Sequence, residues 1–218
     1  LHSATNYELY KGLYSSHNDK NYFEIAYSLN RQFGKYGIYK NLTLYNFVDN
    51  HDVNRIATII NDKRYLNNIY TLLFTIPGIP SIYYGSEWGI EGDRSVTDLT
   101  LRPELSIDDF DNNESSKNLE TFITRLINIR KNNKELTLGI YKEFIVKNRQ
   151  FVFGRYLNNN WIIILLNLDD KEAYIELNSP FKNSTIINLL DENDKYVNEN
   201  NKITIKMNAF SSKILKEI

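Results

Sequence analysis

The stretch Phe47–Arg55, FVDNHDVNR, places an amide, an imidazole and a carboxylate side by side at Asn50, His51 and Asp52. It overlaps the end of the apolar run Leu42–Val48, which is consistent with a short buried strand. In parallel α/β folds the carboxyl ends of strands carry functional groups, because the loops there vary above a rigid core. A carboxylate beside an imidazole can stabilise positive charge, position hydroxyl groups or transfer protons. The structural alternative is that Asn50 or Asp52 caps the following helix.

Helical and strand-like patterns alternate around this stretch. Apolar residues recur at three- and four-residue intervals over Tyr22–Phe33 and Leu119–Ile129, so each segment is expected to form an amphipathic helix. Tyr65–Phe74 is apolar nearly all round, which indicates a helix buried between neighbours. The segment SIYYG, Ser81–Gly85, is expected to be a second short strand. This order predicts parallel βα units, either of a barrel or of a doubly wound sheet.

The last third of the chain has a different pattern. From Glu143 onward the apolar residues follow a period of two or form short runs, separated by Asn- and Asp-rich turns. This pattern predicts an antiparallel β-sandwich. The expected strands are FIVK (144–147), QFVFGRY (150–156), WIIILLNL (161–168), AYIEL (173–177), STIINLL (184–190), KITIKM (202–207) and SKILKEI (212–218). The boundary is expected near residue 139, which gives domains at 1–139 and 140–218.

Composition excludes several classes of function. The 218 residues include 26 basic and 27 acidic side chains, for a formal net charge of -1, so no global basic field attracts nucleic acid or an anionic membrane. No apolar run reaches the roughly 20 residues that a membrane helix needs. Cys is absent, which excludes disulfides and Cys-based metal sites and leaves the compartment open. No glycine-rich phosphate loop follows any expected strand.

Two ordered motifs resemble the α-amylase family, which is family thirteen of the glycoside hydrolases. Phe47-x-x-Asn50-His51-Asp52 resembles one family signature, and GIPSIYYGSEWG (78–89) resembles its Gly-x-Pro-x-x-Tyr-Tyr-Gly-x-Glu segment at the next barrel strand. The resemblance extends to the sixth strand at 1–12, to the last barrel helix at 119–136 and to the β-sandwich C-terminal domain. It implies a partial TIM barrel, about strands six to eight, followed by an antiparallel β-sandwich domain.

The resemblance also implies roles for single residues. Asp52 matches the carboxylate that stabilises the transition state without attacking the sugar. His51 matches a residue that hydrogen-bonds hydroxyls of the sugar being cleaved. Strand alternation would point these two side chains to opposite faces, so Asp52 is expected to lie past the last ladder bond. The further expected substrate contacts are Asn50, Tyr84, Asp98 and Arg102.

Other polar residues are expected to be structural. Arg55 is expected in the first turn of a solvated helix, and His17 in a loop. His2 is expected in the sixth strand. Tyr83, Tyr84 and Glu87 belong to the second motif and are interpreted mainly as scaffold, with a position near the pocket as the alternative for Tyr84 and Glu87. The segment between residues 86 and 113, rich in Asp, Gly and Ser, is expected to be either a functional loop or poorly ordered.

The family's other two catalytic carboxylates have no match in this sequence. Neither the Gly-x-Arg-x-Asp pattern of the nucleophile nor the acid Glu of the fifth strand occurs, and the chain opens with Leu1. We therefore expect the C-terminal portion of a longer retaining α-glucan hydrolase, of the α-amylase or maltodextrin-glucosidase type, that is inactive alone. A transglycosylase of the same superfamily, a catalytically inactive binding or scaffold protein, and a carbohydrate-binding module remain alternatives. Intact His51 and Asp52 favour the enzyme.

The resemblance implies an α-linked gluco-oligosaccharide from starch as the ligand. No cofactor is expected within this chain, and calcium is left open for the longer protein. A partial barrel exposes two strand edges, so the chain is expected to require the missing N-terminal half of the barrel or to self-associate. Localisation stays open between cytoplasmic and secreted.

Overall fold

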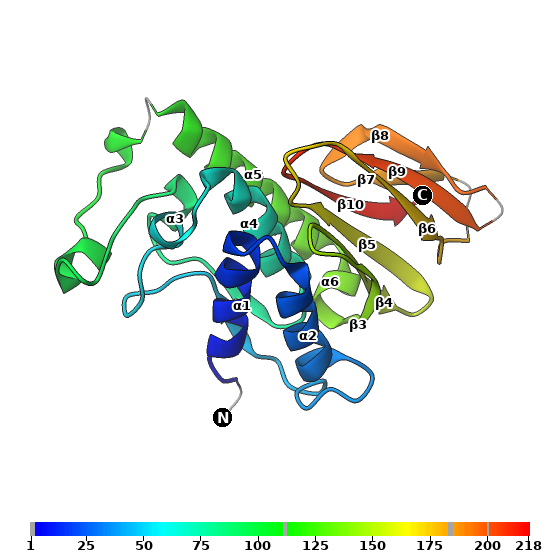
Figure 1. Ribbon diagram of the computed structural model, residues 1–218, viewed down its shortest axis with the longest axis horizontal. Coiled ribbons are helices and arrows are strands. Elements are labelled where there is room, and N and C mark those ends of the chain that lie inside the picture. Colours follow the sequence, from blue (N-terminus) through cyan, green and yellow to red (C-terminus); the bar gives the residue numbers. More distant parts are fainter. Residues whose placement is uncertain (1–2, 111–112, 183–184, 200) are drawn as a thin grey trace.

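The computed structural model describes residues 3–110, 113–182, 185–199 and 201–218, so His2 lies outside the described residues. Helices and parallel strands form the first part of the chain, and antiparallel strands form the second (Figure 1). The α-helices are α1 (Tyr7–Asn18), α2 (Tyr22–Phe33), α3 (Ile56–Ile59), α4 (Leu66–Thr75), α5 (Glu114–Asn132) and α6 (Lys134–Leu138). Short 3₁₀ helices are η1 (Lys63–Tyr65), η2 (Ser86–Trp88), η3 (Asp98–Leu101) and η4 (Ile107–Asp109).

The parallel part of the fold is an open sheet. Strand β1 (Tyr45–Phe47) pairs with β2 (Ile79–Ser81) in parallel register, with Tyr45 opposite Ile79. On the other side of β1, Thr5 forms an isolated parallel bridge to Tyr45. The described residues therefore supply a row of parallel segments in the order Thr5, β1 and β2, and this row does not close into a barrel.

Strand β2 lies earlier than the sequence predicted, since the expected strand was Ser81–Gly85. Gly78 has φ +115°, a conformation that favours glycine, and a Cβ there would lie 2.6 Å from the Leu44 carbonyl oxygen. The chain can therefore turn directly from α4 into the ladder, where the Ile79 N–H donates to the Leu44 carbonyl at 2.7 Å.

Helix α1 corrects two predictions. The segment 1–12 was expected to form the sixth barrel strand. In its described part only Thr5 pairs with the sheet, and the helix begins at Tyr7. The reason is a local cap: the Asn6 side chain accepts a hydrogen bond from the Leu9 N–H at 3.1 Å. His17 lies within this helix and is fully buried, so its expected loop position was wrong.

The other predicted helices are confirmed. Helix α2 spans Tyr22–Phe33 and ends before Gly34, as the spacing predicted. Helix α4 occupies the apolar segment and is buried along most of its length. Helix α5 begins at Glu114, five residues before the predicted start, because the Asn113 side chain caps it through the Ser116 N–H at 3.1 Å.

The C-terminal strands are antiparallel. They are β3 (Ile140–Val146), β4 (Gln150–Leu157), β5 (Asn160–Asn167), β6 (Ala173–Asn178), β7 (Thr185–Asn188), β8 (Asp191–Val197), β9 (Lys202–Met207) and β10 (Ser211–Glu217). Among the described residues, one sheet has the order β3-β4-β5-β10-β7-β8, and β6 pairs with β9 in a second sheet. Strand β8 was not predicted, because its sequence DENDKYV is polar and it lies at a sheet edge. Ser184, the expected start of β7, lies outside the described residues.

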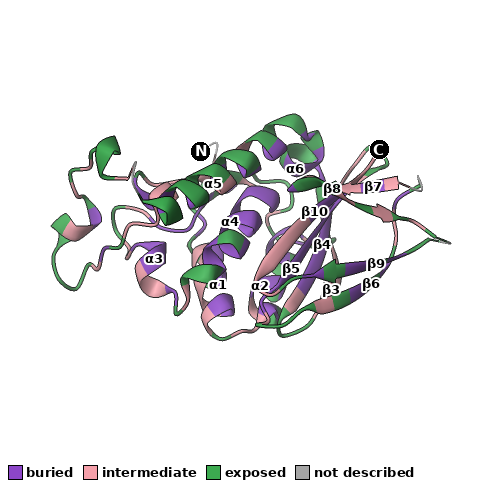
Figure 2. Ribbon diagram, turned by 90° about the horizontal axis from the view of Figure 1, so that it is seen from above, coloured by how far each residue is buried: buried purple, intermediate pink, exposed green. Residues whose placement is uncertain are grey.

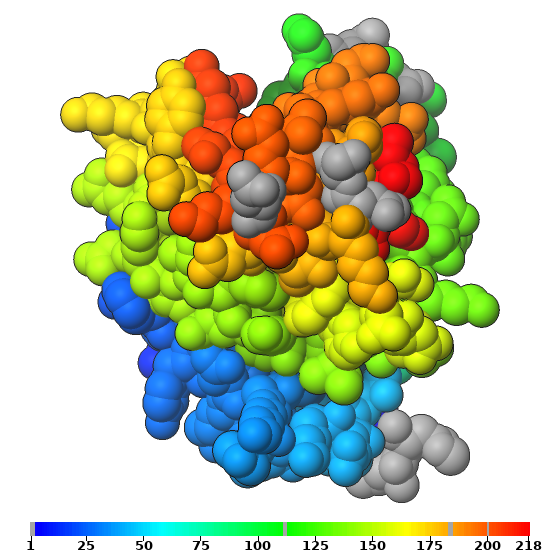
Figure 3. Space-filling model, turned by 90° about the vertical axis from the view of Figure 1, so that its right-hand side faces the viewer, coloured from blue at the N-terminus to red at the C-terminus, as the bar shows by residue number. Residues whose placement is uncertain are grey.

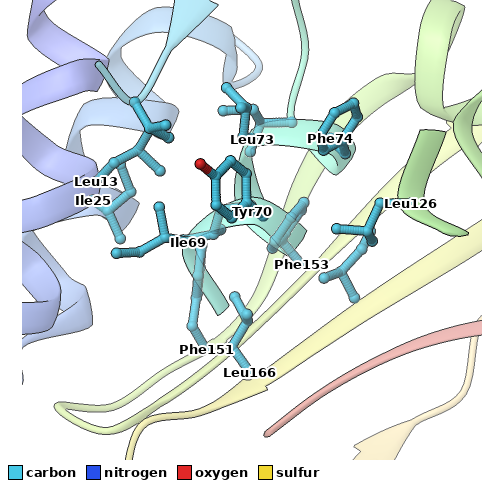
Figure 4. Packing of buried hydrophobic residues seen from close by; sticks show 14 of the residues in the cluster. Leu13, Ile25, Ile69, Tyr70, Leu73, Phe74, Leu126, Phe151, Phe153 and Leu166 are labelled. Carbon is cyan, nitrogen blue, oxygen red and sulfur yellow. The ribbon is translucent and has the colours of Figure 1, made fainter. Parts of the chain in front are cut away.

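Alternating residues of the larger sheet enter two different cores. Phe151 and Phe153 on β4 pack with the helices, whereas Val152 packs with β6 and β9. Buried α4 lies at the centre of the first core, where Tyr70 contributes alongside residues from α1, α2 and the strands (Figure 4). Figure 2 shows the buried faces of α1 and α4.

Seen from the strand side, residues of the two sheets cover most of the surface, with the N-terminal segment, in blue, along its lower edge (Figure 3).

None of the helices in the described part of the chain has the length and apolar character needed to cross a bilayer.

Candidate active site

The FVDNHDVNR stretch leaves the sheet after Phe47 and forms a turn that presents polar side chains. The side-chain carbonyl of Asn50 accepts a hydrogen bond from the Asp52 N–H at 2.8 Å, which stabilises this turn. His51 and Asp52 lie in the turn, with His51 Nε2 3.2 Å from Asp52 Oδ2. Their side chains are 57% and 54% exposed. The carboxylate is therefore held at the end of β1 on an open surface.

Part of the long connection between β2 and α5 folds back onto this turn. Arg102 Nη2 lies 3.7 Å from Asp52 Oδ1, which forms an ion pair. Arg94 Nη1 donates to the Asp52 backbone carbonyl at 3.0 Å, and Arg94 Nε lies 3.6 Å from Asp98 Oδ1. Asp98 and Arg102 therefore belong to one loop that contacts the Asp52 turn, and Asp98 is linked to it through Arg94.

The two tyrosines after β2 are placed differently. Tyr83 lies beside His51, with ring centroids 6.3 Å apart. Tyr84 is turned toward α5, where it shares a groove of about 330 Å³ with Ile82 and Ile127. Its hydroxyl donates to the Pro103 carbonyl at 3.0 Å. The aromatic ring beside the imidazole is thus Tyr83, and no sequence feature distinguished it from its neighbour.

The side chain that accepts the first N–H of α3 is that of Asp49, and not that of Asn50 or Asp52. Asp49 Oδ2 accepts a hydrogen bond from the Ile56 N–H at 2.8 Å, and Oδ1 accepts one from Ser86 Oγ at 2.7 Å. Asp49 is only 1% exposed, and this burial raises its pKa although both hydrogen bonds and the nearby charge of Arg55 act in the opposite direction. Nothing in the sequence pattern indicated this role, because Asp49 and Asp52 follow the same apolar run.

Arg55 has the expected structural role but not the expected solvation. It precedes α3 and has no exposed surface, so the prediction of a solvated position was wrong. Its guanidinium donates to the backbone carbonyls of Tyr84 at 2.7 Å and Leu101 at 2.8 Å. The guanidinium carbon also lies 4.2 Å from the centre of the Tyr83 ring. Both terminal nitrogens of the guanidinium therefore have protein partners in place of water, whereas Nε has no hydrogen-bond partner among the described residues.

His17 and Glu87 lie outside the turn. His17 Nδ1 lies 2.6 Å from the Leu13 carbonyl oxygen and Nε2 lies 3.3 Å from the Tyr22 hydroxyl. Burial lowers the pKa of His17 to about 4, so the imidazole is neutral at pH 7. Glu87 has one buried carboxylate oxygen without a hydrogen-bond partner among the described residues. Neither residue contributes a contact to Asp52.

The described residues provide no cluster of three or more His, Cys, Asp or Glu side chains that could hold a metal ion. A polar cavity of about 650 Å³ lies elsewhere, between Lys63, Trp88 and the start of α5, and none of the predicted site residues lines it.

Comparisons with known proteins define the class. The family model described as "Alpha amylase, catalytic domain" matches residues 6–124, which is more than half of the chain. The chain therefore belongs to the α-amylase family.

Individual relatives show what share of a full-length family member this chain covers. A cyclomaltodextrinase of Thermoanaerobacter pseudethanolicus is 32% identical over 139 residues, which cover 63% of this chain and 23% of the relative. An α-amylase 2 of Dictyoglomus thermophilum is 29% identical over 143 residues, covering 62% and 24%. The chain thus spans about a quarter of the length of these relatives.

A solved structure extends the likeness to the strands. The α-amylase of Geobacillus thermoleovorans, complexed with acarbose, superposes with a TM-score of 0.84 at 18% identity, over 98% of this chain and 47% of that one. The C-terminal sheets therefore have the fold seen in that amylase, and the whole chain corresponds to about half of it.

Proposed function

We propose that this chain is the C-terminal portion of a retaining α-glucan glycoside hydrolase acting on α-glucosidic bonds of starch-derived oligosaccharides. The observation that carries the proposal is the position of Asp52: its carboxylate lies at the carboxyl end of a parallel strand, between His51 and Arg102. In this proposal residues 1–139 are the last part of the barrel domain and residues 140–218 form the β-sandwich domain.

The proposed roles follow from charge and position. Glycoside cleavage passes through an oxocarbenium-like transition state, which the anionic Asp52 side chain stabilises without forming a bond. His51 donates a hydrogen bond to a sugar hydroxyl beside this centre. Asn50 holds the turn and can contact the same sugar. Arg102 and Asp98 bind the next sugar unit, and Tyr84 adds an aromatic contact farther along the surface.

The reaction needs a nucleophile and an acid–base carboxyl, and the family patterns of these two residues have no match in this chain. Retaining hydrolysis uses a nucleophilic carboxylate and an acid–base carboxyl about 5 to 5.5 Å apart. Glu87 lies within the GIPSIYYGSEWG motif, but one of its carboxylate oxygens is buried without a hydrogen-bond partner among the described residues. We therefore propose that both missing carboxylates lie upstream in a longer protein, together with the N-terminal half of the barrel and any calcium ligands.

A transglycosylase of the same family is a second proposal, and one observation favours it. A cyclomaltodextrin glucanotransferase of Bacillus sp. is 28% identical over 121 residues, covering 56% of this chain and 16% of the relative. Transfer and hydrolysis differ in the acceptor that attacks the glycosyl intermediate, so Asp52 would have the same role in both. Product analysis of the longer protein with maltotriose distinguishes the two reactions, because transfer forms oligosaccharides longer than maltotriose and hydrolysis forms only shorter ones.

The proposal is tested by the upstream sequence and by an assay. If the encoded residues before Leu1 contain neither the nucleophile nor the acid pattern, the enzyme proposal is excluded and a binding or scaffold role takes its place. The purified 218-residue chain is expected to give no turnover of p-nitrophenyl maltoside, because it supplies one of three carboxylates. Turnover by this chain alone would refute the proposal that two of the three catalytic carboxylates lie upstream of Leu1.

A further inference from the structure

Arg55 connects three separate segments beneath the candidate site. It lies three residues after Asp52, and its own N–H donates to the Gly92 carbonyl at 3.0 Å. Its guanidinium reaches the Tyr84 carbonyl after β2 and the Leu101 carbonyl in the long loop, at 2.7 and 2.8 Å. One side chain therefore links the Asp52 turn, the end of β2 and the loop that carries Arg102.

Asp49 and Ser86 complete this arrangement, and we call Asp49, Arg55 and Ser86 the anchor unit. Ser86 Oγ donates to Asp49 Oδ1 at 2.7 Å and accepts a hydrogen bond from Arg55 Nη1 at 3.0 Å. The other Asp49 oxygen accepts the Ile56 N–H at 2.8 Å. Asp49 and Arg55 are 1% and 0% exposed, so neither can touch a sugar bound at the surface.

The loop packs closely on the anchor unit. At Gly92 a Cβ would lie 2.4 Å from the Thr100 carbonyl oxygen and 3.0 Å from Arg55 Cγ, so a larger residue would push the loop away. Gly92 N–H also donates to Thr58 Oγ1 at 2.8 Å. Arg102 directly follows Leu101, whose carbonyl Arg55 holds. Arg55 is thus connected to both sides of the ion pair: along the chain to Asp52, three residues earlier, and through its guanidinium to the Leu101 carbonyl beside Arg102.

We propose that the anchor unit positions Asp52 against Arg102, so that Asp49, Arg55 and Ser86 are positioning residues for the sugar-binding turn. This inference rests on the proposed function, in which Asp52 and Arg102 face the substrate. Weakening the anchor unit should therefore release the Asp52 turn and the 92–102 loop together, while the rest of the fold stays closed.

Hydrogen exchange followed by mass spectrometry tests this on the 218-residue chain. Arg55→Met and Ser86→Ala are expected to accelerate exchange at 50–54 and 92–102 by about tenfold or more, with β5 unchanged. The 92–102 segment can report this, because the amides of Gly92, Thr100 and Arg102 all donate to fixed acceptors. Ser86→Ala removes only one hydroxyl, so it keeps the test valid if Arg55→Met does not fold.

Two matched control variants separate positioning from general destabilisation. Arg64→Met removes an exposed arginine that stacks on Phe210, and Ser116→Ala removes a buried serine that donates to the Trp88 carbonyl. Both are expected to leave exchange at 50–54 and 92–102 unchanged. The proposal is overturned if the anchor variants lower the melting temperature without selectively accelerating these two segments, or if the controls accelerate them equally.

An NMR measurement on Arg102 provides a second test. Its signal should change if the anchor unit positions Arg102, and should stay the same if the anchor unit only stabilises the fold. The Nε–Hε resonance of Arg102 reports its ion pair with Asp52, so it should shift in Arg55→Met and return toward the wild-type position in Arg55→Lys. An unchanged Arg102 signal in Arg55→Met would also overturn the proposal. Neither readout requires a sugar, whereas absence of turnover in the longer wild-type protein would count against the proposed function alone.

Discussion

The guanidinium of Arg155 on β4 donates to the backbone carbonyl of Thr75 at the end of α4, at 2.7 Å. It also donates to the carbonyls of Leu136 and Gly139, at 2.9 and 2.8 Å, although the side chain is only 1% exposed. Burial, together with the positive charge of nearby Arg130, lowers the pKa of Arg155 to about 9. The Arg155 guanidinium, which has no carboxylate partner among the described residues, thus joins the helical part of the chain to the antiparallel sheet through backbone carbonyls.

Replacing this arginine should destabilise the junction. Arg155→Met leaves buried carbonyl groups without donors, so we expect the free energy of unfolding to fall by about 3 kcal/mol. Chemical denaturation measures the change. The matched control is Arg149→Met, which breaks an exposed ion pair with Asp169 and should cost less than about 1 kcal/mol. Equal effects of the two substitutions would show that the buried carbonyl contacts do not stabilise the junction.

Asp52→Asn should separate activity from stability. In the longer protein it removes the anionic charge that stabilises the transition state, so turnover should fall by about three orders of magnitude. Because Asp52 is exposed and its ion pairs lie on the surface, the melting temperature of the 218-residue chain should hardly change. A near-normal rate in the longer protein would leave Asp52 as a turn residue only.

The open strand edges should make the isolated chain self-associate. Among the described residues β2 pairs only with β1, and Ile79 on β2 is 46% exposed. Size-exclusion chromatography with light scattering should give a mass above the 25.7 kDa of one chain, rising with concentration. Ile79→Lys should lower that mass, whereas Val96→Lys on an exposed loop should not. A clean, thermally cooperative monomer would contradict the prediction.

His17 should make stability depend on mildly acidic pH. Its pKa is about 4 in the folded chain and 6.5 in an unfolded one, so the unfolded state binds more protons between these values. Stability therefore falls as the pH drops from 6.5 toward 4, and this group accounts for about 3 kcal/mol of the loss.

The variant His17→Gln isolates this contribution. Glutamine can keep a donor toward Leu13 but does not titrate, so the slope of unfolding free energy against pH should be shallower between pH 6.5 and 4. Other titrating groups contribute equally to both proteins. The same slope in both would show that protonation of His17 does not destabilise the fold.

Much of the architecture could be predicted from local sequence. The apolar spacing of Tyr22–Phe33 and the run Tyr65–Phe74 specify helices whose buried faces are encoded by the side chains themselves. The alternating runs after residue 139 specify strands in the same way. Strand β8 was not predicted from the sequence, because its pairing with β7 satisfies backbone hydrogen bonds without requiring apolar side chains.

Local sequence patterns alone indicated that Asn50, His51 and Asp52 follow a buried strand, and the motifs indicated the family. Three features could not be foreseen from these patterns: Asp49 accepts the Ile56 N–H from a buried position, Arg55 is enclosed, and Arg102 lies 3.7 Å from Asp52. The physical reason is that hydrophobic periodicity is a local property of the chain. The partners of a buried charge, in contrast, come from segments that are distant in sequence and meet only after the chain has folded.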